Sequence, residues 1–90
     1  MTNSTLEIQL LSKFKRKGLN YSLQQNANEY IVTIFVSYST GTFFRSYIVN
    51  ILQNNEFLIK YDDKSINTNN VANDIYLDFR NFELKISNIR

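Results

Sequence analysis

The sequence predicts an α+β fold in which a four-stranded antiparallel meander is covered by an N-terminal and a C-terminal helix. The order of elements is α-β-β-β-β-α, in two layers. Helical periodicity at the N-terminal end and a central stretch rich in β-branched and aromatic residues predict these elements. Short polar turns separate the apolar runs, so consecutive strands are expected to pair antiparallel. A chain of 90 residues has room for one core, so residues 1–90 are expected to form a single domain.

The N-terminal helix is expected to run from Thr5 to Lys17. Ser4 and Glu7 stand at the spacing of a capping box, in which each side chain bonds the other residue's backbone amide. Apolar residues then recur on one helix face, at Leu6, Leu10, Leu11 and Phe14, and Ile8 widens that face. Gly18 is placed to adopt the left-handed conformation that ends a helix, with Leu19 touching Phe14.

Four strands are expected between polar turns, at Leu19–Gln24, Tyr30–Tyr38, Phe43–Leu52 and Phe57–Tyr61. The first alternates apolar and polar residues, as a half-buried strand does. The second and third are apolar on both faces, which is typical of central strands. The hairpin loop between these two is expected at Thr40–Thr42, with Gly41 supplying a positive φ angle.

The C-terminal third admits two interpretations after a polar loop at Asp62–Asn70. Apolar residues from Val71 to Ile89 recur at three- and four-residue spacings, and Asn70 is a suitable N-cap, which together favour a helix. Shorter alternating runs in the same segment would instead fit a closing β-hairpin around Arg80-Asn81.

The composition excludes several classes of chemistry. Hydrophobic residues make up 43% of the chain and charged residues 20%, as in globular proteins, but Cys and His are absent. There are therefore no thiolate or imidazole metal ligands and no triad that needs His. No glycine-rich phosphate loop is present either. We expect no catalytic, metal or cofactor-binding residues, no cofactor and no small-molecule substrate, and hence not an enzyme.

The order of elements is similar to that of double-stranded-RNA-binding domains. Those domains carry a basic cluster at the start of their second helix. Here the corresponding stretch Asn69–Asp78 contains no Lys or Arg, so the resemblance does not extend to function.

The two-sided central strands leave one apolar sheet face without an obvious cover. A contiguous exposed patch of this kind is typical of an interface. Its candidate residues are Ile31, Phe35, Phe43, Arg45 and Tyr47. Two alternatives are base stacking by these aromatic side chains beside Arg45, and closure of the second face by the C-terminal segment.

Four of the ten cations lie within five residues, at Lys13, Lys15, Arg16 and Lys17. They could contact nucleic-acid phosphates. Alternatively, cations in the last turn of a helix simply complement its dipole. The net charge of +2 by itself gives little electrostatic steering.

These observations favour a small non-catalytic protein-interaction module that binds a host protein or a second copy of itself, with a homodimer slightly preferred. The runner-up is a nucleic-acid-binding protein that uses the basic end of the first helix. Residues with AT-rich codons, such as Asn, Ile and Lys, are abundant, which suggests a phage or mobile-element regulator or inhibitor, for example of host defence. No secretory leader or apolar span is evident, so we expect a cytoplasmic protein without a membrane partner.

Overall fold

The computed structural model describes residues 2–53 and 56–89, and the side chains of residues 6–53 and 56–86. It contains two helices and one antiparallel sheet with the strand order β1-β2-β3-β4-β5. The elements are α1 (Thr2–Arg16), β1 (Asn20–Asn26), β2 (Glu29–Tyr38), β3 (Gly41–Ile51), β4 (Phe57–Tyr61), β5 (Lys64–Thr68) and α2 (Val71–Ile89). The predicted α+β meander with a helix at each end is confirmed. No helix within the described ranges is long and apolar enough to cross a membrane.

The sheet has five strands, so the prediction of four strands followed by a polar loop was wrong in this segment. Strand β5 pairs with β4 across a tight turn in which Asp62 has a φ angle of 52°. Ile66 lies opposite Ile59 and is the one half-buried apolar residue of β5. A single apolar residue gives no alternation to detect, and short polar edge strands are a common protection against unwanted strand pairing.

The C-terminal segment is a helix over its whole length, which excludes the alternative hairpin. The Oδ1 atom of Asn70 accepts a hydrogen bond from the Asn73 amide at 3.3 Å, which is the predicted N-cap. The Val71 amide donates to Oε1 of Gln9 at 3.0 Å, so a side chain of α1 satisfies a free donor at the start of α2.

Helix α1 begins at Thr2, three residues earlier than predicted, so the helix already includes Ser4 and does not start at the proposed capping box. The Ser4 side chain lies outside the described residues. The predicted end is confirmed: Gly18 has a φ angle of 71°, and the Leu19 amide donates to the Phe14 carbonyl at 2.9 Å. This bond pattern is a Schellman motif, which satisfies the last carbonyls of the helix.

The hairpin between β2 and β3 turns one residue earlier than predicted. Tyr38 pairs with Gly41, so the two-residue loop is Ser39-Thr40, and Gly41 opens β3 with a φ angle of 144°. This shift sets which residues of β3 share a face with which residues of β2, because side chains alternate along a strand.

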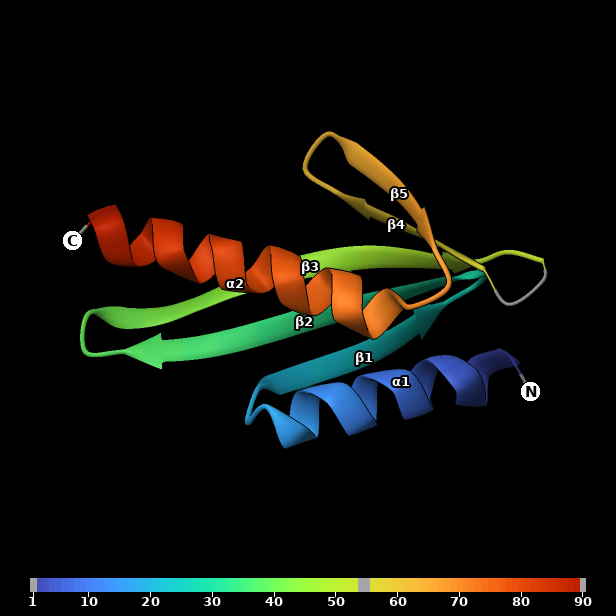
Figure 1. Ribbon diagram of the computed structural model, residues 1–90, viewed down its shortest axis with the longest axis horizontal. Helices are drawn as coiled ribbons and strands as arrows, with labels where there is room; N and C mark the ends of the chain where they lie inside the picture. Colours follow the sequence, from blue (N-terminus) through green and yellow to red (C-terminus); the bar gives the residue numbers. More distant parts are fainter. Residues whose placement is uncertain (1, 54–55, 90) are drawn as a thin grey trace.

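Both helices lie on the same face of the sheet, as predicted. Figure 1 shows α2 crossing in front of β2 and β3, while α1 runs alongside β1. The single core lies between these layers. Its fully buried side chains include Leu6, Leu10 and Phe14 of α1, Val32 and Ile34 of β2, Tyr47 and Val49 of β3, and Val71 and Phe79 of α2.

Candidate functional site

The candidate site is the face of the sheet opposite the helices, which we call the open face. Its central part on β2 and β3 consists of Ile31, Thr33, Phe35, Phe44, Ser46 and Ile48. The register places these residues in three cross-strand pairs: Phe35 with Phe44, Thr33 with Ser46, and Ile31 with Ile48. Directly opposed side chains are the closest neighbours across an antiparallel pair, so the six residues form a continuous strip.

The aromatic pair is the most exposed part of this strip. Phe44 retains 64% of its accessible surface and Phe35 retains 37%. Ile31 and Ile48 are half-buried, although no helix covers them. Between these two apolar pairs, the hydroxyls of Thr33 and Ser46 bond each other at 2.9 Å. Each of the two hydroxyls therefore has a hydrogen-bond partner. Burying this pair costs less free energy than burying two unpaired hydroxyls would.

Polar side chains border the strip on both sides. Asn20, Ser22 and Gln24 of β1 lie opposite Phe35, Thr33 and Ile31. On the other side, Lys60 of β4 lies opposite Ile48, and the half-buried Leu58 of the same strand lies opposite Asn50. Among the described strand residues, Glu29 and Lys60 are the only charged ones on this face. The open face thus has an apolar centre, a polar rim and no net charge, like the core and rim of a protein interface.

The structure divides the five predicted interface residues between the two faces of the sheet. Ile31 and Phe35 lie on the open face. Phe43, Arg45 and Tyr47 lie on the helix-covered face, where Tyr47 is fully buried. The prediction grouped odd-numbered residues of both strands, whereas the hairpin register pairs odd residues of β2 with even residues of β3.

Phe44 and Ile48 are the site residues that the sequence reasoning missed. The two-residue turn at Ser39-Thr40 would have identified them, because it fixes the pairing of every later residue. The prediction placed the turn around Gly41, one residue too far along the chain. That error reverses the sheet face predicted for each residue of β3.

Arg45 lies within a network on the covered face. Its Nε donates to Oδ2 of Asp78 on α2 at 2.9 Å, and its Nη2 donates to Oδ2 of Asp62 at 2.7 Å. The guanidinium also lies 4.8 Å from the Phe82 ring centroid. Arg45 thereby ties β3 to α2 and to the β4–β5 turn, and it is not available to stack on a base.

Tyr47 completes this network by donating from its hydroxyl to Oδ2 of Asp78 at 2.5 Å. Burial raises the pKa of Tyr47 well above its ordinary value, and the hydrogen bond to Asp78 adds to the increase. Tyr47 therefore stays neutral and serves as a donor to a carboxylate that is itself only 15% exposed. The arrangement neutralises buried charge and holds α2 in place.

The predicted basic cluster of α1 is also divided. Lys13 and Lys17 turn towards α2, where their Nζ atoms lie 5.2 and 5.5 Å from the centroid of the Tyr76 ring. Lys15 and Arg16 are exposed and line a different part of the helix surface. The four cations therefore do not form one phosphate-binding edge. Nucleic-acid binding stays a prediction, which the exposed Lys15 and Arg16 support.

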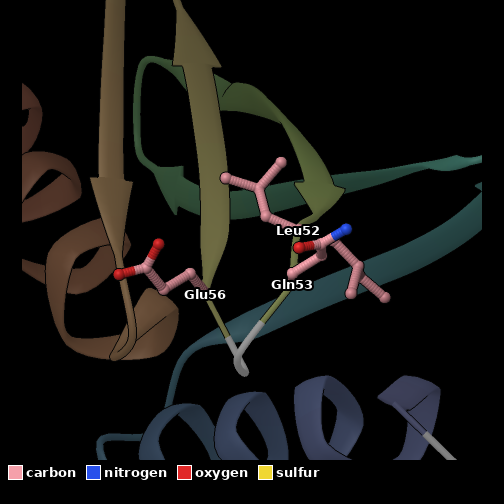
Figure 2. Close-up of a pocket in the computed structure, with 4 residues that line it drawn as sticks. Leu52, Gln53 and Glu56 are labelled. Atoms are coloured by element: carbon pink, nitrogen blue, oxygen red, sulfur yellow. The ribbon is translucent and has the colours of Figure 1, made fainter.

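A hollow of about 650 Å³ lies where β3 passes into β4. Figure 2 shows Leu52, Gln53 and Glu56 around it. The Leu52 amide donates to the Glu56 carbonyl at 2.8 Å, which holds the two sides of this turn together. The hollow borders residues 54–55, which lie outside the described part, and Glu56 is its one charged lining residue.

No protein-family model matches this chain, and no match was found among curated proteins or among solved structures. The candidate site therefore rests on the geometry of the described residues.

Proposed function

We propose that this protein is a non-catalytic interaction module whose open face binds the open face of a second copy, forming a homodimer. The observation that carries the proposal is the exposure of the Phe35–Phe44 pair on a face that neither helix covers. Two-fold pairing buries such a patch against itself.

The size of the open face supports this pairing. With strands about 4.8 Å apart and a rise of about 3.3 Å per residue, the five strands together present roughly 600 Å² in flat projection. A standard protein interface buries about 800 Å² of accessible surface per partner, and accessible area exceeds flat projection. The open face is thus large enough for a stable dimer.

The charge of the open face also favours a second copy over a strongly charged partner. Glu29 and Lys60 balance each other, so two copies meet without net repulsion. This face carries no net charge that would attract an acidic or a basic partner.

Sedimentation equilibrium at tens of micromolar tests the proposal. The wild-type protein is expected to sediment as a dimer of the 10.6 kDa chain, and Phe44→Ser is expected to sediment as a monomer. Leu77→Ser, which removes a similarly exposed apolar residue from α2, is the matched control and should remain dimeric. A wild-type monomer throughout this range, or a dimeric Phe44→Ser protein, would contradict the proposal.

The composition supports a narrower role as a regulator or inhibitor that a phage or mobile element encodes and that binds a host protein. Small size, the abundance of residues whose codons are AT-rich and the absence of His and Cys are its support. Expression of the chain in bacteria that carry a defined defence system is expected to restore plating of a phage that the system blocks. Unchanged plating across a panel of defence systems would count against the inhibitor role and leave the dimer proposal intact.

A further inference from the structure

The outer surface of α1 carries a second apolar feature, which we call the outer groove. It is a shallow, open depression lined by Ile8, Leu11, Ser12, Lys15 and Arg16, all of which belong to α1. Ile8 retains 63% of its accessible surface and Leu11 retains 53%. The two lie three residues apart, so they are neighbours on the helix surface.

The fold itself does not require these two apolar residues. Helix α1 packs on the core through Leu6, Leu10 and Phe14, which are fully buried. Ile8 and Leu11 point away from that core, where a polar residue would serve a solvated helix equally well. Paired apolar side chains beside a hollow are typical of a surface that meets a partner.

The charge around the outer groove is positive. Lys15 and Arg16 line it directly, and the sequence has no acidic residue from Ile8 to Lys17. Glu7, four residues before Leu11, lies at the edge of this surface towards β1, where its charge helps to raise the pKa of Tyr21 after the larger effect of burial. The groove therefore combines an apolar floor with two cations at one end and a single carboxylate at its edge.

We infer that the outer groove binds an acidic amphipathic segment of a partner protein. Apolar side chains of that segment would contact Ile8 and Leu11, while its carboxylates would pair with Lys15 and Arg16. A second copy of this chain is a poor occupant, because two outer grooves would bring four cations together.

Other polyanions fit the groove less well. A nucleic-acid backbone could contact Lys15 and Arg16, but it would leave Ile8 and Leu11 in water. An anionic membrane favours a longer apolar stripe than these two residues provide. The inference is independent of the homodimer, since the outer groove and the open face lie on opposite layers of the molecule.

The test uses a fluorescent synthetic peptide that forms a helix, with leucines at three- and four-residue spacings and glutamates between them. Fluorescence anisotropy is expected to show saturable binding to the wild-type protein that weakens as salt increases. The double variant Ile8→Ser/Leu11→Ser is expected to weaken binding at least about tenfold. The charge reversal Lys15→Glu/Arg16→Glu is expected to weaken it at least as much and to reduce the salt dependence.

Two matched controls separate the groove from general effects. Lys64→Glu/Lys85→Glu changes the net charge by the same amount, away from both the groove and the open face, and should leave binding within about twofold. Leu77→Ser/Leu84→Ser removes an exposed apolar pair from α2 and should also leave binding unchanged. Circular dichroism of every variant checks that the fold is retained.

The inference is overturned if the wild-type protein does not bind the peptide at low salt, or if both double variants of the groove bind it as well as the wild type. It is also overturned if a peptide with lysines in place of the glutamates binds equally well. Duplex DNA or phosphatidylserine vesicles that bind more tightly than the peptide, with the same loss in the Lys15→Glu/Arg16→Glu variant, would assign the groove to those ligands instead.

Discussion

Neighbouring residues of the β2–β3 hairpin have opposite environments although their chemistry is alike. Ile34 and Tyr47 are fully buried beneath the helices, whereas Phe35 and Phe44 lie on the open face and remain largely or partly exposed. Both faces are rich in β-branched and aromatic residues. Apolar residue type therefore marks these strands as central, but the position of the helices decides which face forms the core.

Because one face is buried and the other is exposed, the two faces of the sheet have different roles. Burial on the covered face stabilises the monomer, and each fully buried aliphatic or aromatic side chain contributes about 1.5–3 kcal/mol. The apolar surface of the open face contributes little to the stability of the monomer and remains available for association with a partner. Substitutions at matched positions on the two faces distinguish these roles.

The largest effect is expected from Ile34→Ala on the covered face. Truncating a fully buried isoleucine removes its burial and leaves a cavity, so the free energy of unfolding should fall by about 4 kcal/mol. The matched change Ile31→Ala on the open face should cost about 1 kcal/mol, because Ile31 is only half-buried. Urea denaturation at a concentration low enough to give monomers measures both, and equal losses would refute the division of roles.

A smaller loss, of about 3 kcal/mol, is expected for Arg45→Met. This change leaves Asp62 and Asp78 without their shared cation, and Asp78 is largely buried. Lys60→Met removes a cation from the open face and should change the unfolding free energy by less than about 0.5 kcal/mol. If the two variants unfold at the same urea concentration, the Arg45 network does not stabilise the covered face.

Gly18→Val tests how firmly α1 is held over the covered face, with an expected loss of about 1–2 kcal/mol. Nothing lies within 4 Å of the position where a Cβ atom would be, so the cost comes from the φ angle of 71° alone. Asn adopts this conformation more readily, so Gly18→Asn should lose less than half as much. Equal stability of the valine variant and the wild type in chemical denaturation would contradict this expectation.

One further effect is confined to alkaline pH. Tyr21, Tyr30, Tyr47 and Tyr61 all have pKa values raised above the ordinary value of 10.0, with burial as the first cause, and all lie on the covered face. Their contribution is therefore complete below pH 10 and is lost as the pH rises further, because only the unfolded chain then releases these protons.

Tyr47→Phe should reduce the loss of stability above pH 10 by up to about 1.4 kcal/mol per pH unit. Urea denaturation at successive pH values from neutral to alkaline measures this slope. Parallel stability curves for Tyr47→Phe and the wild type would show that Tyr47 ionises as freely in the folded protein as in the unfolded chain.

Local signals in the sequence predict most of the fold. The periodicity of α1, its end at Gly18 and the N-cap at Asn70 depend on residues close together in the chain, and the structure confirms them. Strand β5 was missed because Ile66 is its only half-buried apolar residue. The start of α1 was also placed too late, because the capping box at Ser4 resembled a helix start.

The candidate site was less predictable, because its residues meet through long-range pairing. Whether Phe44 or Phe43 shares a face with Phe35 depends on a one-residue difference in a turn. The partners of Arg45 lie 17 and 33 residues away in the chain, and both appeared in polar stretches that are typical of solvent-exposed loops and helix faces. Charge alone therefore did not reveal that these carboxylates form a partly buried network.

The meander has a consequence for the order in which the chain folds. Each strand pairs with a strand next to it in the sequence, so hairpins can form one after another as the chain is synthesised. Helix α2 is made after all five strands, and until it arrives the part of the covered face that α2 packs on is exposed together with the open face. We expect the nascent chain to be most prone to aggregation in that interval, and Gln9 to bond the Val71 amide only once the start of α2 has been made.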